Sequence, residues 1–349
     1  MTDAYIHIGT HKTGSTTIQH ALRDISRAHP EEGWIFSGTT ATAKSMMQAQ
    51  QYDQRLVRQF GAEFERLVRQ ARSAQANRVI LSSEALSGLP DDGYLNSKAV
   101  FSMLHDATSR YPVKVIIFLR RQDSFVESMY TQKIHEGGTL EFENFLHQYD
   151  SPDSLDYRRM LDDLGTSFGE QALVVRSYHE SARAGLLADF GEIIGSESLR
   201  YAEQAARNPS YSRHALEIAR ICNQSLDKSG IRRLKRALQA TMPKSRSEPF
   251  SYFSDDARAQ FLDRYEVSNR DVAKRYFGGD LARLFPPPRP ARPASASEGL
   301  QYEEAAGLVV ALLNGDSRDK RRRVVARIRR AILEHPRLRK LVSSVRRRT

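Results

Sequence analysis

The chain has 349 residues, 40% of them hydrophobic, and a formal net charge of +11 at pH 7. This length can bury a sizeable core and accommodates one large domain with an appendage. The single cysteine, Cys222, excludes an internal disulfide framework and a cysteine-based zinc site, and it fits a reducing compartment. Because no apolar run approaches the roughly eighteen residues of a membrane span, and the N-terminus lacks the pattern of a secretory signal, we expect a cytoplasmic protein.

The first predicted element is a short apolar strand over residues 4–8, which runs into a turn bracketed by Gly9 and Gly14 and then into a helix that follows Ser15. In such a turn the backbone N–H groups converge with the first free N–H groups of the helix, where the peptide dipoles also favour an anion. The layout predicts a phosphate-binding loop in which Lys12, inside the turn, faces the group that is transferred.

The spacing of Gly9 and Gly14 matches part of the P-loop of nucleotide triphosphatases, Gly-x4-Gly-Lys-Ser/Thr. Ser15 occupies the position that this motif reserves for lysine, and the lysine of this chain, Lys12, stands three residues earlier. No metal-binding Asp at a strand end accompanies the loop. The sequence therefore argues against an NTPase that uses this loop, while a P-loop kinase and a nucleotide-binding protein without catalysis stay as alternatives.

Apolar runs and helical patterns alternate through the body of the chain. Further strands are predicted at residues 79–81, 113–119 and 172–175, and the clearest helix at 53–72. Other helices are predicted after Ser15, Asp123, Thr139, Tyr157, Ser181 and Tyr211, with two more between Ile231 and Tyr276. The alternation predicts an α/β, P-loop-like three-layer fold with a central, mostly parallel sheet flanked by helices.

Two of these strands are followed by polar residues that would meet at one edge of the sheet. The strand at 113–119 is followed by Arg120, whose planar guanidinium suits phosphate oxygens, and Ser128 lies eight residues later on the next predicted helix. The strand at 79–81 is followed by Ser82-Ser83-Glu84. Because ligands of open α/β sheets bind outside the carboxyl ends of the strands, we expect Glu84 and Arg120 to project towards the same crevice as the loop.

The predicted domain ends where a proline-rich run begins. We expect a domain at 1–285, a Pro/Ala/Ser-rich linker at 286–299 and a basic helical extension at 300–349. The region 318–349 carries fourteen Lys and Arg against two acidic side chains, whereas residues 1–317 are nearly neutral, so nucleic acid is not the expected partner of the body. An apolar stripe among these arginines predicts peripheral contact with an anionic membrane at its inner face. The alternatives are a solvated tail, a helix docked on the main domain and a tail that binds nucleic acid.

The run Lys12-Thr13-Gly14-Ser15-Thr16 resembles the 5′-phosphosulfate loop of the sulfotransferases that use 3′-phosphoadenosine-5′-phosphosulfate (PAPS), in particular the bacterial carbohydrate-type members. In that family a strand ends in Arg, and a Ser eight residues later joins it in holding the nucleotide 3′-phosphate, as Arg120 and Ser128 would here. The resemblance covers most of residues 1–280 in outline, and only these two motifs are specific. It implies PAPS as the donor, bound by Lys12, Thr13, Gly14, Ser15, Thr16, Thr17, Arg120 and Ser128.

Sulfuryl transfer also needs a base, because an acceptor hydroxyl is barely acidic until it begins to bond to sulfur. Sulfotransferases place a His or Glu in this role, and Ser-Ser-Glu after a strand resembles the form common in bacterial members, which indicates Glu84. His11 is the rival, since it stands beside Lys12 and an imidazole titrates nearer neutral pH. The resemblance thus implies Lys12 as the group that stabilises the bridging oxygen, with Glu84 or His11 as the base.

The expected activity follows from this resemblance. It implies an enzyme that moves a sulfuryl group from PAPS to a hydroxyl, or an amine, of a carbohydrate or glycolipid acceptor and releases adenosine 3′,5′-bisphosphate (PAP). No metal is expected, because the histidines show no metal-ligand spacing and the carboxylates form no paired cluster.

Overall fold

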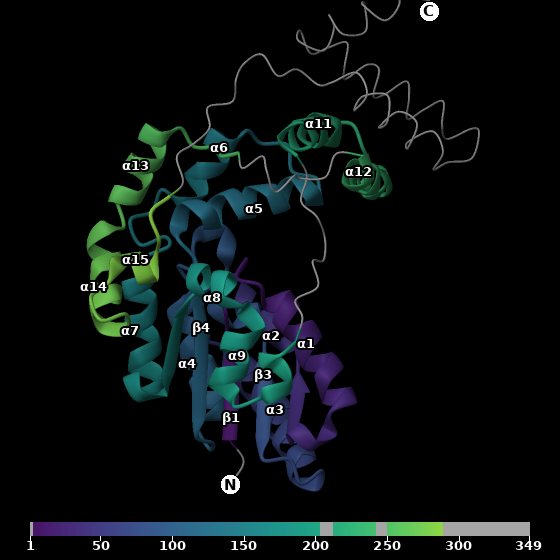
Figure 1. The fold of residues 1–349 in the computed structure, drawn as a ribbon, viewed down its shortest axis with the longest axis vertical. Helices are drawn as coiled ribbons and strands as arrows, with labels where there is room; N and C mark the ends of the chain where they lie inside the picture. The colour runs from purple at the N-terminus through teal and green to yellow at the C-terminus, as the bar shows by residue number, and fades with distance from the viewer. Residues whose placement is uncertain (1–2, 203–211, 242–249, 289–349) are drawn as a thin grey trace, which may run out of the picture. The chain divides into compact units, whose positions relative to one another are not determined.

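The computed structural model describes residues 3–202, 212–241 and 250–288 (Figure 1). Most of the predicted linker, 286–299, and the whole of the predicted basic extension, 300–349, lie outside these residues. The expectations for the tail, including its contact with a membrane, therefore stay predictions.

A sheet of five parallel strands forms the centre of the fold, in the spatial order β2-β3-β1-β4-β5. The strands are β1 (Asp3–His7), β2 (Trp34–Ser37), β3 (Arg78–Ser82), β4 (Val113–Leu119) and β5 (Leu173–Ser177). All of them except β2 were predicted from apolar runs. The parallel sheet between helices confirms the predicted α/β fold class.

The central strand, β1, is hydrogen-bonded to β3 on one side and to β4 on the other. Ile6 of β1 lies opposite Leu81 of β3 and Val115 of β4. The segments that follow these three strands therefore emerge side by side at the carboxyl edge of the sheet. Because the chain goes from β1 to one side for β2 and β3, and to the other side for β4 and β5, this edge contains the switch point at which open α/β sheets bind ligands.

The connecting helices cover both faces of the sheet (Figure 1). α1 (Ser15–Ala28) carries the chain from β1 to β2 in one direction, whereas α3 (Gln54–Ser73), α4 (Ser97–Thr108) and α7 (Tyr157–Phe168) carry it across the sheet in the other. With right-handed crossovers, this reversal of direction places α1 on one face and the other three helices on the opposite face.

α9 (Leu186–Ile194) and α10 (Glu197–Arg200) share the face that α1 covers. A buried apolar cluster joins these helices to the sheet; it includes Tyr5, Ile18, Leu22, Ile80, Ile116, Phe118, Leu186, Leu187, Phe190, Ile194 and Leu199. The cluster fixes α1 against the strands and so fixes the position of the loop that precedes α1.

The remaining helices are α2 (Ala41–Gln48), α5 (Gln122–Glu136), α6 (Phe142–Leu146), α8 (Tyr178–Ala184), α11 (Arg213–Asn223), α12 (Lys228–Thr241), α13 (Asp255–Asp263), α14 (Glu266–Tyr276) and α15 (Leu281–Leu284). Two helices were predicted between Ile231 and Tyr276, and that number was too low. In the described residues of this region, 231–241 and 250–276, there are three helices, α12, α13 and α14, and the turn between α13 and α14 carries neither Gly nor Pro that would have separated them in the sequence.

The chain divides into two compact units. The first contains the sheet and comprises Met1–Val126, Leu146–Ala205 and Asp256–Arg289, and the second comprises Glu127–Phe145, Ala206–Asp255 and Pro290–Thr349. Within the second unit, the side-chain amide of Asn223 donates to the carbonyl oxygens of Ile134 and Gly138 at 2.8 and 2.9 Å. These bonds tie α11 to the end of α5. The domain limits expected from the sequence remain a prediction.

Candidate functional site

The loop between β1 and α1, residues 9–14, has three residues in the left-handed backbone region. Their φ angles are 25° at Gly9, 65° at Lys12 and 80° at Gly14. The conformation suits the two glycines, but at Lys12 it costs about 1–2 kcal/mol, because a side chain crowds the following carbonyl. Strain of this kind is concentrated at functional sites.

Gly14 is the N-terminal cap residue of α1. The cap has no side-chain hydrogen bond, and the first turn of the helix contains no acidic residue. The first N–H groups of the helix therefore keep the positive potential that binds an anion. A Cβ atom at Gly14 would collide with the side chain of Leu186, so both the φ angle and the packing require glycine here.

Threonine side chains brace the loop from inside. The buried Thr10 hydroxyl donates to the carbonyl oxygen of Phe118 at 2.8 Å and thereby ties the loop to the end of β4. The Thr13 hydroxyl donates to the carbonyl oxygen of Thr10, and its predicted contact with phosphate stays a prediction. Of the other hydroxyls predicted to contact phosphate, Ser15 is buried, Thr17 is half-buried and Thr16 is exposed.

Arg120 follows β4 and reaches the same loop. Its Nη1 donates to the carbonyl oxygen of Lys12 at 2.7 Å, and its Nε donates to Ser124 Oγ at 3.0 Å. The guanidinium carbon also lies 5.2 Å from the ring centroid of Tyr178, which is within range of a cation–π contact. The structure therefore brings together two of the predicted residues, Lys12 and Arg120, from opposite sides of the switch point.

Ser128, the predicted partner of Arg120, is half-buried on α5. It belongs to the second compact unit, whereas Arg120 belongs to the first. Their joint contact with one phosphate stays a prediction.

Glu84 lies in the turn that follows β3 and is half-buried. Its Oε2 accepts a hydrogen bond of 2.9 Å from Nε2 of Gln19, and the same nitrogen lies 3.2 Å from the carbonyl oxygen of Ser82. Because Gln19 belongs to α1, the helix that begins at the loop also holds this carboxylate. Gln19 was not predicted, since its role depends on a contact between α1 and β3 that the sequence does not display.

His11 is held by a buried tyrosine. Its backbone N–H donates to Tyr94 Oη at 2.8 Å, and its Nδ1 lies 3.3 Å from the same oxygen. Burial raises the pKa of Tyr94 well above its usual value, so the hydroxyl stays protonated and neutral. Tyr94 itself has a φ of 69°, the second strained position beside the loop. Nothing in its local sequence predicted this contact.

Arg121, the residue after Arg120, is bonded to a buried carboxylate and not to the loop. Arg121 pairs with the buried carboxylate of Asp123 through two bonds, of 2.7 and 3.0 Å, and Asp123 also lies 3.3 Å from Nε of Arg258. His179 Nε2 accepts from the backbone N–H of Arg121 at 3.1 Å. Burial, with Arg121 and Arg120 nearby, lowers the pKa of His179 to about 4. His179 is therefore a neutral acceptor at neutral pH.

His7, inside β1, is fully buried, and this burial lowers its pKa to about 3. Its Nδ1 is 2.8 Å from Ser82 Oγ, while Nε2 has no hydrogen-bond partner among the described residues. The ring lies directly under Gly9, where an added Cβ atom would come within 2.7 Å of Nε2. His7 therefore supports the loop from below and is placed for neither acid nor base chemistry with solvent.

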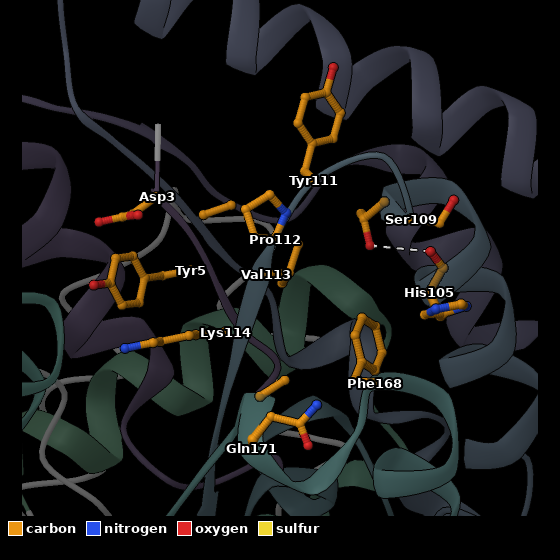
Figure 2. A pocket seen from close by; sticks show the side chains of 13 residues that line it. Asp3, Tyr5, His105, Ser109, Tyr111, Pro112, Val113, Lys114, Phe168 and Gln171 are labelled. Atoms are coloured by element: carbon orange, nitrogen blue, oxygen red, sulfur yellow. Dashed lines mark hydrogen bonds between the residues drawn. The ribbon is translucent and has the colours of Figure 1, made fainter. Parts of the chain in front are cut away.

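Figure 2 shows a cavity of about 400 Å³ lined by Tyr5, Lys114, Phe168 and neighbouring residues. These residues belong to the amino ends of β1 and β4 and to the end of α7. Because parallel strands have all their amino ends at one edge, the cavity lies at the edge opposite the loop. It is not part of the candidate site.

Across residues 3–202, 212–241 and 250–288, no three His, Cys, Asp or Glu side chains gather closely enough to hold a metal ion. In the same ranges, no helix combines the length and the hydropathy that crossing a bilayer requires.

No protein-family model matches the chain. A stretch of 173 residues is 28% identical to an uncharacterized protein of Archaeoglobus fulgidus and spans 47% of this chain and 46% of that relative, less than half of its length. Among solved structures, the fold is similar to a sulfotransferase from Alicyclobacillus acidocaldarius, with a TM-score of 0.40, 15% identity and coverage of 60% of this chain and 87% of that chain. It is also similar to a retinol dehydratase in complex with androsterone and inactive cofactor PAP, with a TM-score of 0.34, 11% identity and coverage of 77% and 81%.

Proposed function

We propose that this chain transfers a sulfuryl group from PAPS to a hydroxyl or amine of an acceptor and releases PAP. The observation that supports this most is the bond between Arg120 Nη1 and the carbonyl oxygen of Lys12, at 2.7 Å. This bond brings a guanidinium beside the loop that, in this proposal, binds the anion at the switch point of the sheet. A nucleotide with a phosphate at each end of its ribose, such as PAPS, has the two anionic groups that such a pair recognises.

In this proposal the loop and the start of α1 hold the 5′-phosphosulfate through backbone N–H groups and the hydroxyls of Ser15, Thr16 and Thr17. Arg120, with Ser128, holds the 3′-phosphate. Lys12 stabilises the negative charge that grows on the oxygen bridging phosphorus and sulfur as the S–O bond to the nucleotide breaks. The acceptor oxygen forms the new bond to sulfur, and its proton passes to the base.

Glu84 is our first choice for that base, because α1 holds its carboxylate through Gln19 while the side chain stays half-exposed at the carboxyl edge. His11 remains the second candidate, since its ring contacts the neutral hydroxyl of Tyr94. Either side chain can take a proton from an acceptor that approaches along this edge.

We further propose a carbohydrate or glycolipid acceptor, a cytoplasmic site of action and no metal. The acceptor class rests on the resemblance of the motifs, the absence of a metal on the lack of metal-ligand spacing in the sequence, and the proposed peripheral contact of residues 318–349 with an anionic membrane on the basic amphipathic pattern of that segment. A protein that binds the nucleotide without catalysis remains the second candidate function, because every contact described here would also serve binding alone.

The decisive experiment measures PAP binding by calorimetry and, separately, the release of PAP from PAPS in the presence of extracts of the cell envelope of the source organism. Binding of PAP with turnover supports the transferase. Binding without turnover under any acceptor supports the non-catalytic alternative, and failure to bind PAP refutes both.

A further inference from the structure

Gln19, a half-buried residue of α1, donates through one nitrogen to two oxygens at the carboxyl end of β3. Its Nε2 lies 2.9 Å from Oε2 of Glu84 and 3.2 Å from the carbonyl oxygen of Ser82. An amide nitrogen carries two hydrogens, so both contacts can be hydrogen bonds at the same time. Because the carbonyl oxygen of Ser82 can only accept, the side chain of Gln19 must present its NH2 group, and not its oxygen, to Glu84.

The position of this amide is set by parts of the fold other than Glu84. Ile18 precedes Gln19 in α1 and Leu22 follows it by three residues, and both are fully buried in the cluster that joins α1 to the sheet. The bond to Ser82 fixes the far end of the side chain to the last residue of β3. All five residues belong to the first compact unit. A side chain that is held at both ends loses little further freedom when it donates to a carboxylate, so it is suited to orient one.

The two carboxylate oxygens of Glu84 have different surroundings. Oε2 faces an amide hydrogen of Gln19, so a proton added to this oxygen would displace that hydrogen bond. Among the residues that the structure describes, none makes a hydrogen bond with Oε1. Oε1 is therefore the oxygen that can take a proton without the loss of a bond.

We propose that Gln19 is a positioning residue for the base, and that the proton of the acceptor passes to Oε1 of Glu84. In the transfer step the acceptor oxygen bonds to sulfur, and the bond between sulfur and the bridging oxygen of the nucleotide breaks. The acceptor proton moves to Oε1 while Gln19 keeps Oε2 in place. This inference rests on the proposed function. Because α1 also begins at the loop that would hold the donor, one helix orients both the donor and the base.

The alternative is a bond that only fastens α1 to β3. The loss of such a bond would shift the helix and the loop at its start, so it would weaken PAP binding and lower turnover whether or not residue 84 carries a carboxylate. A positioning residue acts through the carboxylate alone. The two roles therefore differ in whether the effect of Gln19 on turnover depends on Glu84.

The test is a double-mutant cycle of Gln19→Met and Glu84→Gln in the full chain. Methionine has nearly the length of glutamine but donates no hydrogen bond. The matched control is His20→Met, which removes a half-buried polar side chain from the next position of the same helix. Turnover is the release of PAP from saturating PAPS with an extract of the cell envelope of the source organism as the source of acceptor. Calorimetry gives the PAP affinity of each protein, and circular dichroism verifies its helical content.

We expect Gln19→Met to lower turnover by about tenfold, a part of the roughly 10²–10⁴-fold contribution of a general base, and to change PAP affinity by less than about twofold. In the Glu84→Gln background the same substitution should lower turnover by less than about twofold. His20→Met should also stay within about twofold of the wild-type rate. Equal losses from Gln19→Met in the two backgrounds would overturn the proposal, as would a parallel loss of PAP affinity.

The wild-type chain separates this inference from the proposed function. If the wild-type chain releases PAP and Gln19→Met is equally fast, the positioning role is refuted and the transferase stands. If the wild-type chain binds PAP but shows no turnover under any acceptor, the transferase is refuted, and the role of Gln19 with it.

Discussion

Arg120 and Lys12 are 108 residues apart in the chain, yet the guanidinium of one donates to the backbone carbonyl oxygen of the other at 2.7 Å. Arg120 reaches this position because β4 lies directly beside β1 in the sheet. This hydrogen bond lies at the switch point of the sheet. It also orients Lys12, the strained residue of the loop, whose φ is 65°. The first two predictions concern its two members.

Replacing Arg120 by Ala should weaken PAP binding by about ten- to hundredfold, because charge-assisted hydrogen bonds contribute roughly 1.5–3 kcal/mol each. The maximal rate at saturating PAPS should fall much less. Arg120→Lys keeps the charge without the planar fork and should recover only part of the affinity. Calorimetry with PAP gives the dissociation constants, and an unchanged affinity in Arg120→Ala would remove this residue from the site.

Replacing Lys12 by Ala should do the reverse. Turnover should fall by about 10²–10³-fold, the usual effect of removing one group that stabilises charge in the transition state, with PAP affinity changed by less than about threefold. Lys12→Gly should be equally slow but more stable than Lys12→Ala by about 1 kcal/mol, because glycine relieves the left-handed strain. Single-turnover kinetics gives the rates of the variants, and denaturant unfolding gives their stabilities. Full activity of Lys12→Ala would exclude Lys12 as the group that stabilises the bridging oxygen.

The fold could be predicted to the extent that each strand buries a continuous apolar run. β1, β3 and β4 bury such runs, and β5 was predicted from a run in which only Val175 is buried, whereas β2, an edge strand of four residues of which only Trp34 is buried, was missed. The loop and Arg120 were predicted because their residue types and order match the motif of a known family. Gln19 and Tyr94 were not, because their contacts with Glu84 and His11 join segments 65 and 83 residues apart.

The two candidate bases can be separated by variants that preserve shape. Glu84→Gln should lower turnover by about 10²-fold, within the usual contribution of general base catalysis, and leave PAP affinity unchanged. His11→Asn should lower it by only a few-fold. Rates measured at saturating PAPS decide the matter, and the opposite ranking would assign the base to His11.

His179 gives the protein a dependence of stability on pH. Its pKa is about 4 in the folded protein and about 6.5 when unfolded, so the unfolded chain takes up a proton first as the pH falls. The contribution of His179 to the free energy of unfolding should therefore be full above pH 6.5, fall between pH 6.5 and 4 by up to about 3 kcal/mol, and level off below. His179→Gln keeps an acceptor for the N–H of Arg121 but cannot titrate. Denaturant unfolding at pH 7 and pH 4.5 should show a smaller loss in the variant, and equal losses would contradict the assignment.

Gly14 should tolerate no side chain, for two reasons that can be measured separately. Its φ of 80° disfavours any L-residue, and a Cβ atom would also collide with Leu186. Gly278 has a φ of 65° with no atom within 4 Å of an added Cβ, so Gly278→Ala isolates the backbone cost, about 1–2 kcal/mol. Gly14→Ala should cost more than this by about 1–3 kcal/mol, the usual penalty of overpacking.

If the collision with Leu186 causes the extra cost of Gly14→Ala over Gly278→Ala, shortening the Leu186 side chain should relieve that cost. In a double-mutant cycle, Gly14→Ala should therefore cost about 1–2 kcal/mol less in a Leu186→Ala background than in the wild-type chain. Unfolding free energies of the four proteins provide the coupling. Strict additivity would show that Leu186 does not limit the space at the start of α1, and that the backbone angle alone makes glycine necessary at this end of the loop.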